Sequence, residues 1–238
     1  MSRDILSESY FESTFSRHNI LTRDQFERAC LEFDACYSSI LPKDKNSKIL
    51  DVGCGAGHFL YYLEKKGYKN HWGIDVSGQQ VEFCEKYVTK RVSESDATTF
   101  LEDNDSAFDL IVVHDVLEHI PKDSTLALIS SVWRSLKSGG RCIVRVPNMS
   151  NPFSLDSCYR DFTHETGFTD KSLFQIMWSA GFRTIEMTSS QIHVRSLKNR
   201  FRRLLVRTLH QAIRFLFYIQ DYSVPDHLGK NLICVCKK

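Results

Sequence analysis

A glycine-rich segment is the first part of the chain whose residue types point to chemistry. Residues 51–57, with the sequence DVGCGAG, directly follow a short apolar run and precede a helical pattern. Glycines let a backbone approach a ligand with which a Cβ atom would collide. A loop of this kind taken alone also forms tight strand-to-helix turns, but in a doubly wound sheet it is the place where nucleotide-like ligands bind. We expect ligand contacts at Gly53, Cys54, Gly55 and Gly57.

An acidic residue lies where such a ligand needs one. Asp75 ends the next apolar run, 20 residues beyond Gly55, and Val76 follows it. A carboxylate at the end of the second strand can accept hydrogen bonds from both hydroxyls of a ribose. Asp75 could also cap the helix that starts near Ser77, and the two roles are compatible.

The loop favours a sulfonium cofactor over NAD. NAD fingerprints place two residues between the second and third glycines, where this loop has only Ala56, so that a helix N-terminus meets the pyrophosphate. Here Asp51 precedes the loop. Its carboxylate would repel a pyrophosphate but suits a ligand with a cationic amino group. The sequence therefore indicates S-adenosylmethionine, with S-adenosylhomocysteine as the product.

Five motifs extend this interpretation to a family. They are ILDVGCGAG at 49–57, GID at 73–75, SDATTF at 95–100, FDLIVVHDVLEHIP at 108–121 and LKSGGRCIVRVPN at 136–148. Their order and spacing resemble class I S-adenosylmethionine-dependent methyltransferases over about residues 45–190. The resemblance implies a methionine site lined by residues 51–57 and 114–116, a ribose site and an adenine site. The residues it adds are Asp75 for the ribose, Asp96 and Ala97 for the adenine, and His114, Asp115 and Val116 beside the methionine.

Two polar segments are candidates for the acceptor side. Asp115, Glu118 and His119 follow the fourth predicted strand, and residues 160–165 (RDFTHE) follow the fifth. Methyl transfer is an in-line displacement, so the enzyme supplies positioning and, for a hydroxyl acceptor, a base. Histidine titrates near neutral pH, and we expect His164 or His119 to be this base, together with Asp161. For His119 the alternative is a hydrogen bond to the turn before Pro121.

The same residues suggest a divalent metal as another option. Oxygen and imidazole groups at Asp115, Glu118, His119 and His164 would suit magnesium, manganese or iron. The spacing resembles the E-x-x-E/H-H set, with a distant histidine, of metal-dependent small-RNA 2′-O-methyltransferases and of quinone-pathway O-methyltransferases. The first position here is Asp115 rather than a glutamate, which has a longer side chain.

The elements that must hold these residues form an α/β pattern. Apolar runs predict strands at Lys48–Val52, Trp72–Asp75, Phe108–Val113, Arg141–Val146, Arg183–Thr188 and Leu232–Cys236. Helical patterns lie at Phe59–Lys66, Gly78–Val88, Ser124–Leu136 and Lys171–Ser179, the last closed by Gly181. Apolar runs without alternation, separated by helices, are typical of a parallel sheet covered on both faces. We expect a doubly wound, Rossmann-like domain.

Length and composition indicate the number of domains and the class of protein. The chain has 238 residues, 42% of them hydrophobic and 25% charged, which suits a single methyltransferase domain. Within it we expect a helical lid (1–45), a cofactor-binding core (46–190), a helical insertion (191–228) and a final strand (229–238). Eight scattered cysteines without a C-x-x-C pair argue against a disulfide scaffold. Residues 1–10 contain no apolar stretch of the kind that begins a secretion signal, so we expect a cytoplasmic protein.

Positive charge is concentrated before the final strand. Residues 195–214 carry seven lysines and arginines and no acidic residue: Arg195, Lys198, Arg200, Arg202, Arg203, Arg207 and Arg214. The spacing of the apolar residues predicts a basic amphipathic helix over residues 196–219. It could pack on its own domain or in a homodimer, or attach the protein to the inner face of an anionic membrane. Nucleic acid is a weaker candidate, because no aromatic residues alternate with the arginines.

The acceptor is indicated by a looser resemblance. The basic insertion, the RDFTHETGFT segment at 160–169 and SLFQIMWSAGF at 172–182 resemble bacterial methyltransferases of surface-polysaccharide synthesis. This implies an O-methyltransferase acting on a saccharide or a lipid-linked glycan. The alternatives are a quinone-like small molecule, an RNA ribose, or a noncatalytic protein that binds S-adenosylmethionine.

Overall fold

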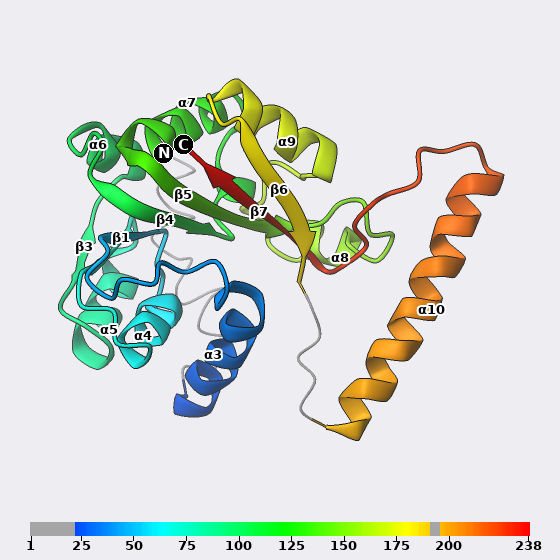
Figure 1. Ribbon diagram of the computed structural model, residues 1–238, viewed down its shortest axis with the longest axis horizontal. Helices are drawn as coiled ribbons and strands as arrows, with labels where there is room; N and C mark the ends of the chain where they lie inside the picture. The colour runs from blue at the N-terminus through cyan, green and yellow to red at the C-terminus, as the bar shows by residue number, and fades with distance from the viewer. Residues whose placement is uncertain (1–21, 191–195) are drawn as a thin grey trace.

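The structure is a computed structural model that describes residues 22–190 and 196–238. Within them, a seven-stranded sheet with the order β3-β2-β1-β4-β5-β7-β6 forms the centre of the fold (Figure 1). The strands are β1 (Ile49–Val52), β2 (His71–Asp75), β3 (Val92–Glu94), β4 (Phe108–His114), β5 (Leu136–Pro147), β6 (Thr184–Ser189) and β7 (Asn231–Lys237). The predicted α/β Rossmann-like fold is confirmed.

One strand runs against the others. The pairs from β3 through β5 are parallel, but β7 is antiparallel to both β5 and β6. The parallel arrangement expected for β1, β2, β4 and β5 is confirmed, whereas the direction of β7 was not predicted, because an apolar run does not indicate the direction of a strand. As a result Ser189 at the end of β6 pairs with Leu232 at the start of β7, and Pro147 at the end of β5 pairs with Asn231. The β6–β7 connection thus leaves and returns at the carboxyl edge of the parallel strands.

Helices cover both faces of the sheet, as Figure 1 shows. They are α3 (Arg23–Tyr37), α4 (His58–Lys65), α5 (Gly78–Tyr87), α6 (Ala97–Glu102), α7 (Lys122–Ser135), α8 (Leu155–Tyr159) and α9 (Asp170–Ser179). Ile111 and Val113 of β4 pack in a cluster with α7 and α9, and Leu110 and Val112 pack in a second cluster with α3 and α4. Because both faces are buried, the strand is apolar without alternation from Leu110 to Val113.

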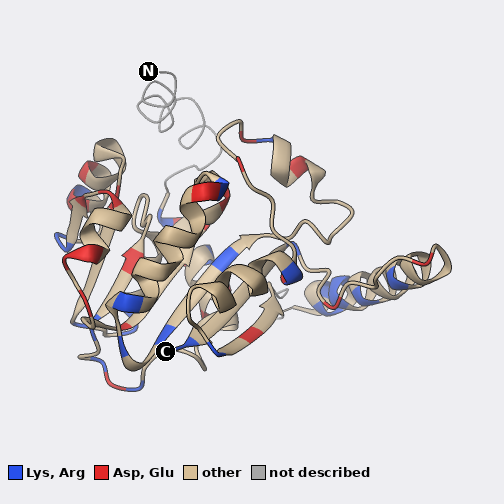
Figure 2. Ribbon diagram, turned by 90° about the horizontal axis from the view of Figure 1, so that it is seen from above, with Lys and Arg blue, Asp and Glu red and all other residues tan. Residues whose placement is uncertain are grey.

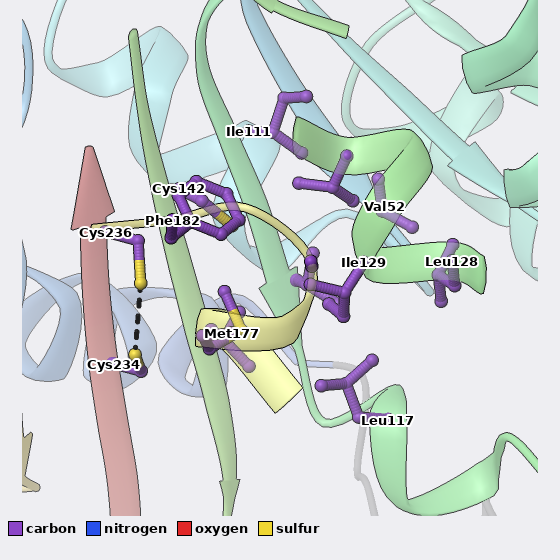
Figure 3. Close-up of a cluster of buried hydrophobic side chains, with 14 of the residues drawn as sticks. Val52, Ile111, Leu117, Leu128, Ile129, Cys142, Met177, Phe182, Cys234 and Cys236 are labelled. Atoms are coloured by element: carbon purple, nitrogen blue, oxygen red, sulfur yellow. Dashed lines mark hydrogen bonds between the residues drawn. The ribbon is translucent and has the colours of Figure 1, made fainter. Parts of the chain in front are cut away.

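The larger cluster fills the space between the sheet and α7 and α9. Figure 3 shows Ile111 of β4 and Cys142 of β5 beside Ile129 of α7 and Met177 of α9. Cys234 and Cys236 of β7 face the same cluster, with their sulfur atoms 3.3 Å apart. The cysteines here act as small apolar side chains. This packing fixes the strand ends that carry the candidate site.

The N-terminal helix α3 shares its core with α4. Its side chains Phe26, Cys30, Phe33 and Tyr37 are buried, and the last three pack with Phe59, Tyr62 and Leu63 of α4. Phe26 stacks on His58, the first residue of α4, with ring centroids 4.2 Å apart. This helix therefore buttresses the segment that follows the glycine loop. The rest of the expected lid, residues 1–21, lies outside the described residues.

The basic helix is present and projects from the domain. Helix α10 (Leu197–Ile219) extends away from the sheet in Figure 1 and joins β6 to β7. Ser196 caps it, since its side chain accepts a hydrogen bond from the N–H of Asn199 at 3.2 Å. Ile213 is its one buried residue. Among the described helices none is both long enough and apolar enough to cross a bilayer.

Candidate active site

Three positions of the glycine loop have backbone conformations that favour glycine. Gly53, Gly55 and Gly57 have φ angles of 67°, 54° and 85°, in the left-handed region. A Cβ atom on Gly53 would lie 2.3 Å from Cγ2 of Val116, and one on Gly57 would lie 2.4 Å from the sulfur of Cys84. Any side chain at either position would therefore disturb the packing around β1 and α4. Glycine at these positions lets the loop backbone lie close to the side chains of Val116 and Cys84.

Asp75 ties the end of β2 to this loop. One carboxylate oxygen accepts a hydrogen bond from the backbone N–H of Gly55 at 2.8 Å, and the other accepts one from the N–H of Ser77 at 2.9 Å. Burial raises the pKa of Asp75, although these backbone hydrogen bonds counteract it. Each oxygen retains a second lone pair for a ribose hydroxyl. The two roles expected of Asp75, ligand contact and helix start, are compatible in this geometry.

Asp51 is a buried carboxylate without a hydrogen-bond donor among the described residues. It is 2% exposed, and burial, followed by the nearby charge of Asp75, raises its pKa well above the usual range. An ionised carboxylate in such a place is costly unless a positive group accompanies it. The cationic amino group of S-adenosylmethionine would meet this need. The residues at the end of β1 thus fit the expected cofactor.

The residues expected at the adenine lie at the start of α6. Asp96 caps this helix, and its Oδ1 accepts hydrogen bonds from the N–H and hydroxyl of Thr99 at 2.9 and 3.1 Å. The residue is exposed, so Oδ2 is available for an exocyclic amine. Ala97 is partly buried beside it, and Val76, directly after β2, is 63% exposed. An exposed apolar side chain here suits contact with a ring.

His114 packs in an aromatic stack and is not placed as a reactive group. Its ring lies parallel to those of Phe33 and Tyr37, with centroids 5.6 and 5.1 Å away. Burial, and then the charge of Arg145, lowers its pKa well below the usual value. The imidazole is therefore neutral. It shapes the site where β4 meets α3.

Asp115 is held by Arg145, an arginine inside β5 that the sequence analysis did not single out. Nε of Arg145 donates to Oδ1 of Asp115 at 3.1 Å, and Nη2 donates to Oδ2. The same guanidinium lies 3.7 Å from a carboxylate oxygen of Glu32 in α3. Asp115 has a φ of 52°, which aspartate tolerates better than most residues. The available signal was a positively charged residue inside the apolar run Cys142–Val146.

His119 and the segment around Asp161 meet in the structure. The one-turn helix η2 (Leu117–His119) follows β4, and Nδ1 of His119 lies 2.8 Å from Oγ1 of Thr163. The Thr163 hydroxyl donates to Oδ1 of Asp161 at 2.7 Å. The ring of His164 lies edge-on to that of His119, with centroids 4.7 Å apart. The structure thus brings together the three residues expected to act on the acceptor.

This network assigns the tautomer of His119. An ionised carboxylate only accepts, so the hydroxyl proton of Thr163 points to Asp161. Nδ1 of His119 must then carry the proton that it shares with Thr163, which leaves Nε2 unprotonated. Burial, and then the neighbouring His164, lowers the pKa of His119. Burial also opposes the charge on Asp161, but the hydrogen bonds from Thr163 outweigh it and lower the pKa of that carboxyl.

Glu118 lies close to His119 and His164 and forms a cluster with them. It is 3% exposed, and its Oε2 is buried without a hydrogen-bond partner among the described residues. Burial, and then the charge of Asp115, raises its pKa well above the usual range. Ligand atoms of Glu118, His119 and His164 lie within 4.8 Å of one another, so the structure groups three of the four proposed metal-binding residues. It does not group Asp115 with them, because Arg145 engages both of its oxygens.

Comparison with known proteins agrees with this geometry. A family described as "Methyltransferase domain" matches residues 21–187. The chain is 26% identical over 189 residues to O-methyltransferase 3 of Dictyostelium discoideum, covering 68% of this chain and 42% of that protein. It is 31% identical over 126 residues to the ubiquinone biosynthesis O-methyltransferase of Bartonella quintana, covering 51% and 49%. The chain thus spans about half the length of these curated relatives, or less.

A solved structure extends the match to the whole fold. The SAM-dependent methyltransferase from Archaeoglobus fulgidus superposes with a TM-score of 0.68 at 20% identity, and the match covers 99% of both chains. At this identity the likeness concerns the fold. The family match spans most of the chain and includes the glycine loop, Asp75 and the β4 motif. The chain belongs to this family of methyltransferase domains.

Proposed function

We propose that this enzyme transfers a methyl group from S-adenosylmethionine to a hydroxyl of a saccharide or glycan intermediate. The observation that carries the proposal is the chain of hydrogen bonds from Asp161 through Thr163 to Nδ1 of His119. It presents an unprotonated Nε2 at the carboxyl edge of the sheet. A base of this kind is needed when the acceptor is a hydroxyl, whose proton must leave.

The residues described above have separate tasks in this reaction. Asp51, Asp75 and the glycine loop would hold S-adenosylmethionine, which supplies an electrophilic methyl group. As the acceptor oxygen bonds to the methyl carbon and the carbon–sulfur bond breaks, Nε2 of His119 accepts the hydroxyl proton. The bonding electrons leave with the sulfur. The charge of Asp161 then favours the imidazolium, as it does in other oriented histidine–carboxylate pairs.

His164 contributes to the positioning of His119. Its edge-on contact with His119 limits the rotation of that ring, and its backbone N–H donates to the carbonyl of Asp161 at 3.2 Å. The carbonyl of Glu118 accepts hydrogen bonds from the N–H groups of Glu165 and Thr166 at 2.7 and 3.2 Å. These contacts fasten the loop after α8 to η2. The base is therefore held on a braced turn, which preserves its orientation.

Exposed aromatic residues support a saccharide as the acceptor. Phe153, Tyr159 and Phe162 are 65%, 79% and 88% exposed in the segment that leads to His164. Aromatic faces offer flat apolar surfaces with polar groups nearby, a combination found in many small-molecule sites. The C–H faces of a sugar ring suit such surfaces, while its hydroxyls suit the polar groups around His119.

A divalent cation is the second candidate chemistry at the same place. It is favoured by the close approach of Glu118, His119 and His164 and by the buried Oε2 of Glu118 without a described partner. A cation held there would polarise the acceptor hydroxyl in place of a base. Arg145 would compete for Asp115, which leaves two imidazoles and one carboxylate as ligands.

The acceptor class is tested by following labelled methyl groups. The enzyme is incubated with methyl-labelled S-adenosylmethionine and with nucleotide sugars, lipid-linked saccharides, a quinol precursor or RNA in separate reactions. We expect label in a saccharide fraction as a methyl ether, identified by mass spectrometry after hydrolysis. Label that enters only the quinol or the RNA would contradict the saccharide proposal. Label on a nitrogen atom would contradict O-methylation itself.

A further inference from the structure

Helix α10 turns its apolar side chains away from the domain. Its buried residue, Ile213, marks the side that faces the protein. With 100° between successive residues, five large apolar residues lie on the side opposite Ile213, and they are 55–81% exposed: Leu197 (81%), Phe201 (63%), Leu204 (60%), Phe215 (62%) and Ile219 (55%). A surface helix of a globular protein normally turns its apolar stripe to the core. We call these five residues the outer stripe.

The charge of α10 is of one sign. The helix carries six lysines and arginines and no aspartate or glutamate. Figure 2 shows the blue basic positions along its length. With 100° between successive residues, Arg200 and Arg207 flank the outer stripe on one side and Lys198 flanks it on the other. All three are exposed. An apolar stripe with basic flanks matches the boundary between acyl chains and anionic headgroups.

We propose that α10 binds the surface of anionic phospholipid membranes, lying flat with the outer stripe among the upper acyl segments. At 1.5 Å per residue its 23 residues extend about 34 Å along the surface. Its lysines and arginines then meet lipid phosphates. This attachment is peripheral, in keeping with the lack of a spanning helix among the described residues.

The structure links this helix to the acceptor side of the site. The side-chain amide of Asn148, just after β5, donates to the carbonyls of His227 and Gly229 at 2.9 and 3.0 Å. The amide of Asn151 donates to the carbonyl of Leu228 at 3.0 Å. The segment that returns from α10 is therefore fastened to the loop that leads to His164. Membrane attachment would bring that loop towards the bilayer, where a lipid-linked acceptor would be; this last step rests on the proposed function.

Vesicle flotation tests the attachment independently of activity. The protein is mixed with phosphatidylcholine vesicles that contain either no anionic lipid or about 30 mol% phosphatidylglycerol. We expect flotation with the anionic vesicles and its loss at high salt. Arg200→Glu with Arg207→Glu should weaken partitioning by roughly 30-fold or more, since each basic residue near the surface contributes about 1 kcal/mol. Phe201→Ser with Phe215→Ser should also abolish flotation.

Matched variants and an oligomerisation assay complete the test. Lys69→Glu with Lys90→Glu makes the same charge change at exposed positions near β2 and β3, and should leave flotation unchanged. Equal binding to neutral and anionic vesicles, or binding that ignores either pair of α10 substitutions, would overturn the proposal. So would absence of vesicle binding combined with a dimer, measured by analytical ultracentrifugation, that Phe201→Ser with Phe215→Ser dissociates.

Discussion

Nδ1 of His119 lies 2.8 Å from the hydroxyl oxygen of Thr163, and that hydroxyl donates its proton to Asp161. The pair joins residues 44 positions apart in the sequence. Because Thr163 has one hydroxyl proton, its bond to Asp161 determines which nitrogen of His119 is protonated. The direction of a single hydrogen bond therefore prepares the imidazole to accept a proton at Nε2.

The pH dependence of turnover follows from this arrangement. Burial and the neighbouring His164 lower the pKa of His119 from its ordinary value of 6.5. A base works in its neutral form, so the rate should be full at and above neutral pH. It should fall only as the pH drops below about 6.5, through the lowered pKa. The measurement is kcat/KM for the acceptor against pH at saturating cofactor.

Thr163→Val tests the hydrogen-bond chain on which this profile depends. The substitution keeps the shape of the side chain but removes the hydroxyl that joins Asp161 to His119. We expect a lower kcat with unchanged affinity for S-adenosylhomocysteine, since Thr163 is assigned no cofactor contact. A wild-type profile that rises only above pH 8, or a Thr163→Val enzyme with full kcat, would contradict the assigned tautomer.

Asp51→Asn should stabilise the ligand-free protein but weaken its binding of the cofactor. Burial raises the folded-state pKa of Asp51 above its unfolded value, so the carboxylate's contribution to the free energy of unfolding decreases as the pH rises through the folded-state pKa. The neutral, isosteric asparagine should therefore raise Tm of the ligand-free enzyme at neutral pH, by about 2–4 °C for each kcal/mol relieved. Loss of a charged hydrogen bond should weaken S-adenosylmethionine binding by roughly 10- to 150-fold.

Differential scanning calorimetry and titration calorimetry measure these two effects. Asp105→Asn removes one negative charge from an exposed position and should change neither quantity. An Asp51→Asn protein with lower Tm, or with wild-type affinity for S-adenosylmethionine, would contradict the assignment of Asp51 as the partner of the cofactor's cationic amino group. A wild-type protein that binds NAD and not S-adenosylmethionine would contradict the cofactor assignment altogether.

Local patterns were sufficient to predict the core of the cofactor site. The glycine loop, Asp75 and the strands that carry them are contiguous in sequence, and the observed β1, β2 and β4 begin and end within one residue of the predicted strands. The short β3 (Val92–Glu94) and α6 (Ala97–Glu102) were not predicted, because three and six residues give too little periodicity. Helix α10 was predicted with its correct end, since its pattern spans 23 residues.

Relationships between distant segments could not be predicted in this way. The pairing of Arg145 with Asp115 depends on the neighbouring positions of β4 and β5 in the sheet. The role of Thr163 depends on a loop that folds back onto η2. The direction of β7 and the outward orientation of the apolar residues of α10 depend on how the chain returns to the sheet. Each depends on how distant segments pack together, which local sequence patterns do not specify.

Chelation combined with two substitutions tests the role of His119 most directly. The account predicts that a chelator leaves methyl transfer unchanged, that Glu118→Gln is mild, and that His119→Ala lowers kcat by roughly 10²–10⁴-fold with cofactor affinity intact. Loss of turnover on chelation that a divalent cation restores, with Glu118→Gln as damaging as His119→Ala, would contradict the base and favour a metal. Full activity of the His119→Ala/His164→Ala enzyme would contradict both.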